Sequence, residues 1–88
     1  MNETPENWIF IEEVEGSFVF ENSNHTFTVF IDFNSSLETP YVIGYEQLEG
    51  DYELIEIEEG VFTTSAQTQT DAQTKAFLLM NFINEKFT

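Results

Sequence analysis

Hydrophobic and polar residues alternate over short segments in the first two thirds of the chain. The clearest alternation covers 25–33, where one face would hold Phe27, Val29, Ile31 and Phe33 and the other Thr26, Thr28, Phe30 and Asp32. A period of two is typical of a strand with one buried face. Aromatic and β-branched residues mark four further candidate strands, at 7–14, 17–21, 41–48 and 52–58.

Turn residues separate these segments at short intervals. Glu15-Gly16 follows the first segment, and Glu49-Gly50 precedes the last. Strands joined by such short turns predict an antiparallel meander of four or five strands within 7–62. Gly44, inside the fourth segment, is a candidate for a β-bulge.

A helical pattern occupies 71–87, after a polar connector at 63–70. Thr70 and Gln73 match a capping box with Thr70 as the N-cap. A stripe about 100° wide, the width of a core-facing surface, collects Ala72, Ala76, Leu79, Met80, Ile83 and Phe87. We therefore expect one α+β domain over 1–88, with a flexible N-terminus at 1–6 and the C-terminal helix packed on one face of the sheet.

Leu78 and Phe82 lie on a different side of this helix from the stripe. They either form a homodimer seam or a partner-binding patch, or are covered by the first strand or the N-terminus.

The composition supports a folded protein. The 88 residues are 41% hydrophobic and include 10 Phe, 3 Tyr and 1 Trp, enough for one modest core. Cysteine is absent, which excludes disulfides, cysteine nucleophiles and thiolate zinc sites.

No segment approaches the ~20 apolar residues of a membrane span. The N-terminal residues are acidic, unlike a secretory signal, so we expect a cytoplasmic protein.

The charge is strongly one-sided. The chain has seventeen acidic residues but only two lysines, Lys75 and Lys86, and no arginine, which gives a formal net charge of −15. Such a chain repels nucleic acid and anionic membranes and attracts basic proteins. Because ordinary surfaces mix both signs and unbalanced charge destabilises the folded state, this composition needs an explanation.

One explanation is imitation of nucleic acid. Carboxylates two residues apart on one strand lie about 6.6 Å apart, and those on adjacent strands about 4.8 Å apart, a pitch that can imitate a line of phosphates. The acidic face predicted to bind the partner comprises Glu46, Glu49, Asp51, Glu53, Glu56 and Glu58. In composition the chain resembles small acidic phage and plasmid inhibitors that imitate nucleic acid, although it matches no family by motif. The resemblance implies a phage or mobile-element protein that occupies the nucleic-acid site of a basic host protein.

A second explanation is adaptation to a cytoplasm of molar salt. Halophilic proteins also lose lysine and gain acids, although here Glu outnumbers Asp by 14 to 3, which is unlike that adaptation. In that case the apolar helix or dimer surface would carry the function. A third, weaker alternative is a module that responds to calcium or another cation.

Enzymatic chemistry is not expected. The chain has no EF-hand loop, no phosphate-binding glycine loop and no metalloprotease or serine-hydrolase motif. His25 is the single histidine, and it lies beside a turn with no recognisable general-base partner. We therefore assign no catalytic residue, no metal site and no cofactor.

Overall fold

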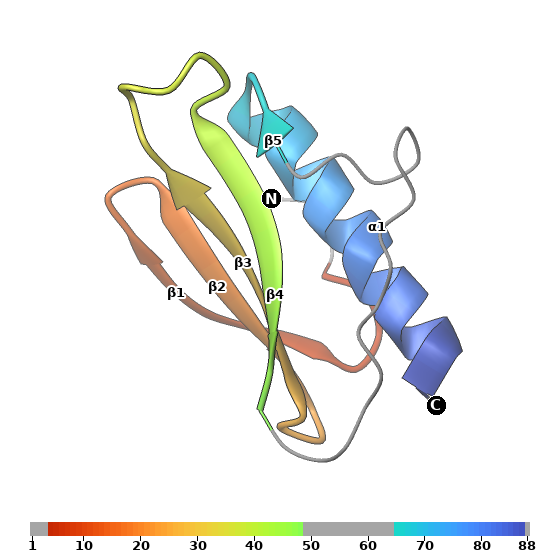
Figure 1. The fold of residues 1–88 in the computed structure, drawn as a ribbon. Helices are drawn as coiled ribbons and strands as arrows, with labels where there is room; N and C mark the ends of the chain where they lie inside the picture. Colours follow the sequence, from red (N-terminus) through yellow and green to blue (C-terminus); the bar gives the residue numbers. More distant parts are fainter. Residues whose placement is uncertain (1–3, 49–64, 88) are drawn as a thin grey trace.

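The computed structural model describes residues 4–48 and 65–87. In these ranges five strands form one antiparallel sheet in the order β1-β2-β3-β4-β5, and a helix packs on one face (Figure 1). The elements are β1 (Trp8–Val14), β2 (Ser17–Asn22), β3 (Phe27–Phe33), β4 (Tyr41–Gln47), β5 (Ser65–Ala66) and α1 (Gln69–Phe87). The predicted α+β fold, an antiparallel sheet with one C-terminal helix on a face, is therefore confirmed. The strand predicted at 52–58 lies outside the described residues.

The β1–β2 hairpin turns on Glu15 and Gly16. Both have positive φ angles, 50° and 87°, and Val14 pairs with Ser17 across them. Two central residues with positive φ are typical of the type I′ turn, whose twist matches that of the two strands. The sequence prediction of a turn at this position is correct.

The bulge of the sheet lies in β1, not at Gly44. The β1–β2 register shifts between Phe10 and Glu12, whereas Gly44 pairs regularly with Phe30. A methyl group built at Gly44 would lie 2.5 Å from Cζ of the Phe30 ring. Gly44 therefore leaves room for an aromatic ring on the neighbouring strand and does not bend its own strand.

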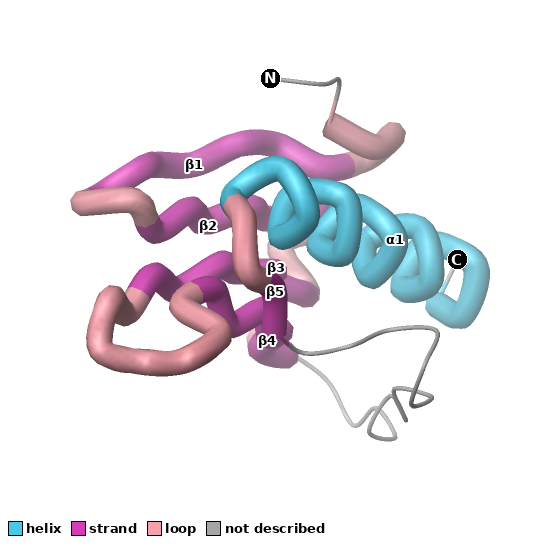
Figure 2. Tube along the Cα trace, turned by 90° about the horizontal axis from the view of Figure 1, so that it is seen from above, coloured by secondary structure: helices cyan, strands magenta, loops and turns pink. Residues whose placement is uncertain are grey.

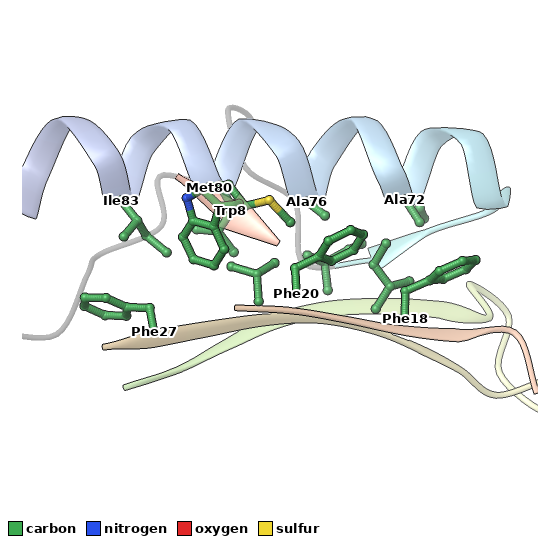
Figure 3. Close-up of a cluster of buried hydrophobic side chains, with 13 residues drawn as sticks. Trp8, Phe18, Phe20, Phe27, Ala72, Ala76, Met80 and Ile83 are labelled. Atoms are coloured by element: carbon green, nitrogen blue, oxygen red, sulfur yellow. The ribbon is translucent and has the colours of Figure 1, made fainter. Parts of the chain in front are cut away.

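The core lies between the sheet and α1 (Figure 3). From the sheet come Phe18 and Phe20 of β2, and Phe27, Val29 and Ile31 of β3, all buried. From the helix come the five predicted stripe residues whose side chains are described, namely Ala72, Ala76, Leu79, Met80 and Ile83. The period of two in the strands and the stripe on the helix thus both identify core residues.

The helix begins two residues earlier than the capping pattern predicts. Thr68 is the N-cap, since its Oγ1 accepts a hydrogen bond from the backbone N–H of Asp71 at 3.1 Å. Thr70 lies inside the first turn, where its carbonyl accepts a hydrogen bond from Thr74 Oγ1. The short strand β5 forms within the predicted connector, and the chain enters the helix directly after it.

Two sets of polar contacts tie the ends of the helix to the sheet layer. Near the start of α1, Lys75 Nζ donates to the Ser65 carbonyl at 2.9 Å and lies 3.1 Å from Asp71 Oδ2. Near its end, Trp8 Nε1 donates to Asn84 Oδ1 at 3.0 Å, and Asn84 Nδ2 donates to the Glu6 carbonyl at 2.9 Å.

Candidate functional site

The structure describes one of the six acidic residues predicted to bind the partner. Glu46 is exposed near the end of β4. The other five lie outside the described residues: Glu49, Asp51, Glu53, Glu56 and Glu58. Glu46 and the described side chains that share its face of the sheet form the candidate site.

Glu46 lies on the face of the sheet opposite α1. Side chains alternate between the two faces along a strand, and residues paired across two strands share a face. With the core residues toward the helix, the opposite side, here named the open face, comprises Ile9, Glu12, Val14, Ser17, Val19, Glu21, Thr28, Phe30, Asp32, Val42, Gly44 and Glu46. Every one of these residues is exposed or half-buried. Figure 2 shows α1 lying along one side of the strands.

Four carboxylates share the open face. Glu21 pairs with Thr28, and Thr28 pairs with Glu46, so the two glutamates occupy one row across β2, β3 and β4. Two strand spacings separate their backbones by about 10 Å. Glu12 lies one strand and two residues from Glu21, about 8 Å away, and Asp32 lies four residues, about 13 Å, along β3 from Thr28.

Apolar side chains fill the middle of the open face. Val19 pairs with Phe30, and Phe30 pairs with Gly44, on which its ring lies. Ile9 and Val14 of β1 lie diagonally across from Val19, on either side of Glu12, and are 52% and 56% exposed. The open face therefore combines an apolar centre with a surrounding set of carboxylates, and protein-binding surfaces often have an apolar centre and a polar rim.

Positive charge is confined to the helix side of the molecule. Both lysines lie on α1, and Lys75 is engaged by Asp71 and the Ser65 carbonyl. His25, in the turn after β2, contacts the Glu21 carboxylate through Nδ1. Strands β1 to β4 contain no lysine and no arginine, so the open face has a negative potential that the lysines on the other side do not cancel locally.

The two residues of the predicted helix patch differ in their surroundings. Leu78 is 46% exposed. Phe82 is half-buried and packs against the core. Phe77 also packs there, and the centroid of its ring lies 5.9 Å from that of Phe20 in an edge-on arrangement. The arrangement leaves Leu78 as the exposed member of the pair.

Within 4–48 and 65–87, no three acidic or histidine side chains lie close enough to hold a metal ion. No helix in the described part of the chain is long and apolar enough to cross a bilayer.

The chain matches no protein-family model, no curated protein and no solved structure. The assignment of the candidate site therefore rests on the geometry of this chain alone.

Sequence reasoning did not select three of the open-face acids, Glu12, Glu21 and Asp32. Alternation within each strand places Glu21 with Val19 and Asp32 with Thr28, so part of the signal is present in the sequence. Glu21 and Glu46 lie in one row only because β2, β3 and β4 pair in this register, and alternation within one strand does not specify that pairing.

Proposed function

We propose that this protein is a non-enzymatic acidic inhibitor that occupies the nucleic-acid site of a basic protein. The observation that supports this most directly is the open face, where Glu12, Glu21, Asp32 and Glu46 surround an apolar centre and no basic side chain lies on the four long strands. A phage or mobile-element origin fits such an inhibitor.

The spacing of the four carboxylates suggests how they would imitate nucleic acid. The backbone separations of neighbouring carboxylates, about 8 Å for Glu12 and Glu21 and about 10 Å for Glu21 and Glu46, lie between the groove widths of B-DNA, about 6 Å and 12 Å. The carboxylates would therefore stand for phosphates on opposite sides of a groove, not for successive phosphates of one strand. The other five acids of the predicted partner-binding face would add to this charge.

The apolar centre gives the inhibitor a means of binding that a nucleic-acid backbone lacks. Steering by the negative field would accelerate encounter with a basic surface. Burial of Val19, Phe30 and their neighbours would then slow dissociation, since apolar burial is less sensitive to salt than charge pairing. The complex would weaken as salt rises but would keep a salt-resistant part of its affinity.

Displacement of DNA tests the proposal directly. Fluorescent duplex DNA is bound to each member of a panel of basic DNA-binding proteins, and this protein is titrated in while anisotropy is followed. We expect displacement from at least one panel member, with an affinity that falls as potassium chloride is raised from 50 to 300 mM. Failure to displace DNA from any member contradicts the proposal.

Two quadruple variants with equal charge separate the open face from net charge. The first neutralises the open face with Glu12→Gln, Glu21→Gln, Asp32→Asn and Glu46→Gln. The control neutralises four exposed acids elsewhere, with Glu6→Gln, Glu15→Gln, Glu38→Gln and Glu85→Gln. We expect the first to weaken displacement about tenfold or more and the control to change it by less than about threefold. Equal losses in the two variants would assign the effect to net charge alone.

The acids beyond Glu46 have their own test. Reversing Glu56 and Glu58 together should sharply reduce displacement, because both belong to the predicted partner-binding face. Unchanged affinity would remove these two residues from the site.

A further inference from the structure

Strand β1 forms one edge of the sheet, and its outer side has no neighbouring strand in the described part of the chain (Figure 1). An edge strand presents a row of backbone N–H and C=O groups on which another strand can form. We propose that β1 is a docking edge on which an extended, basic segment of a partner protein adds as a further strand. The inference rests on the proposed function only in taking the partner to be basic.

The exposure of β1 supports this role. After the buried Trp8, every residue of the strand is exposed. Four of these residues are large and apolar, namely Ile9 at 52%, Phe10 at 38%, Ile11 at 49% and Val14 at 56% exposed. Side chains on both faces are uncovered, which is what the absence of a neighbour along one edge produces.

Phe10 shows what an added strand would complete. It pairs with Phe20 on the helix side of the sheet, and its ring lies 5.5 Å from that of Phe20 and 6.3 Å from that of Phe18. Despite these aromatic contacts the residue stays more than a third exposed. A side chain placed beside Phe10 by an added strand would cover the rest of the ring and extend the core.

The protection of β1 against unwanted pairing is uneven. Natural sheets shield their edges with charges, prolines, bulges or very short strands, and the opposite edge, β5, has two residues. In β1 the bulge lies at Ile11 and both acids follow it, whereas Ile9 and Phe10 precede the bulge and no charge or proline lies among Ile9, Phe10 and Ile11. The first half of β1 therefore offers apolar contacts and the second half offers negative charge.

The charges of β1 specify the occupant. Glu12 pairs with Val19 on the open face and Glu13 pairs with Phe18 on the helix side, so the strand presents a carboxylate on each face. A partner strand with lysine or arginine opposite this half would pair with both. A second copy of the chain would instead bring another net charge of −15 to the same edge. Charge complementarity thus favours a basic segment.

The N-terminal end of β1 is held in place before any partner arrives. The Trp8 indole is hydrogen bonded to Asn84 of α1, and the Trp8 backbone N–H donates to the Pro5 carbonyl at 3.2 Å. The Asn7 carbonyl accepts from the Ser23 backbone N–H at 2.7 Å. An edge fixed in this way loses less conformational freedom on binding than a mobile segment would.

The experiment uses two synthetic peptides and the 88-residue chain. One peptide has five apolar β-forming residues followed by threonine, two consecutive lysines and threonine, so that its lysines lie on opposite faces of the added strand, as Glu12 and Glu13 do. The other has the same sequence with alternate backbone nitrogens methylated, which removes hydrogen-bond donors without changing the charge. Backbone amide hydrogen exchange is measured by NMR, and affinities are measured by titration.

We expect the unmodified peptide to slow exchange of amides within Ile9–Val14 about tenfold or more, because strand addition pairs edge groups that otherwise face water. The methylated peptide should bind about tenfold more weakly. The variant Glu12→Gln with Glu13→Gln should lose more affinity than the equally charged control Glu38→Gln with Glu85→Gln.

Three results would overturn the inference. Equal affinity of the two peptides would indicate electrostatic adsorption, and protection confined to other elements would place the site elsewhere. Protection of β1 without peptide, increasing with protein concentration, would identify a second copy as the occupant. The readout is independent of DNA displacement, so failure of the β1 test leaves the proposed inhibitor role standing, and the reverse also holds.

Discussion

Asn22 is a buried polar residue that organises the turn between β2 and β3. Its Oδ1 accepts hydrogen bonds from the backbone N–H groups of Thr26 and Phe27, at 2.8 and 3.0 Å. Its Nδ2 donates to Thr26 Oγ1 at 2.7 Å. His25, within the same turn, has a positive φ of 57°. The amide side chain thus bonds backbone N–H groups on both sides of the start of β3.

Removing the Asn22 amide should therefore cost more than its size suggests. We expect Asn22→Ala to lower the free energy of unfolding by about 2–3 kcal/mol, since three hydrogen bonds of a buried side chain are lost. The measurement is urea denaturation followed by circular dichroism.

The neighbouring substitution Ser23→Ala is the matched control. Ser23 is exposed, and its backbone hydrogen bond to the Asn7 carbonyl does not depend on its side chain. This variant should change stability by less than about 0.5 kcal/mol. Similar losses in the two variants would show that the Asn22 side chain does not hold the turn.

At the scale of elements, Phe30 of β3 and Gly44 of β4 form a matched pair on the open face. The position of a methyl group at Gly44 is within 3 Å of two atoms of the Phe30 ring, at 2.5 Å and 2.8 Å. The ring is the far end of a movable side chain, so a substitution can be accommodated if the ring leaves its place. Glycine itself weakens a strand relative to residues with a side chain.

A double-mutant cycle tests this pair. We expect Gly44→Ala alone to destabilise the protein by about 1 kcal/mol, because the Phe30 ring must move. In a Phe30→Ala background the same substitution should be neutral or stabilising, because the obstacle is gone and alanine is less costly than glycine in a strand. Denaturation midpoints of the four proteins give the coupling energy, and additive effects would contradict the contact.

The elements were predictable to the extent that they depend on local pattern. Alternation identified Phe27, Val29 and Ile31 as one buried face. Alternation also placed Phe33 on this face, but Phe33 lies at the end of β3 and is 39% exposed. The centroid of its ring lies 5.0 Å from that of Tyr41. The helix cap was misplaced because Thr68 and Thr70 are both suitable caps, and the end of β5 selects the first.

The candidate site was less predictable than the core, for a physical reason. Burial of an apolar side chain is signalled by its own strand, whereas a binding surface depends on which strands pair and in which register. Glu21 and Glu46 are 25 positions apart in the sequence and become neighbours in a row only through Thr28. The bulge after Phe10, which sets the face on which Glu12 lies, has no clear signature in the sequence.

At the scale of the whole molecule, a well-packed core opposes a repulsive surface. Within 4–48 and 65–86, thirteen apolar side chains are buried between sheet and helix. Among the described residues, every buried side-chain nitrogen or oxygen has a hydrogen-bond partner. Against this, the net charge of −15 disfavours the compact state. An inhibitor must be folded at ordinary salt, whereas a protein adapted to molar salt has no such requirement.

The balance between core and charge predicts the response of stability to salt. We expect cooperative thermal unfolding by circular dichroism in 10 mM buffer, because the core is built from large aromatic and aliphatic side chains. Molar potassium chloride should raise the midpoint by only a few degrees, since it screens repulsion between exposed charges but adds no core contact. The open-face quadruple variant, with four fewer negative charges, should unfold at a higher temperature than the parent in dilute buffer and gain less from salt. A parent chain that folds only in molar salt would contradict the inhibitor proposal, identify the charge as salt adaptation and direct attention to Leu78 on the helix.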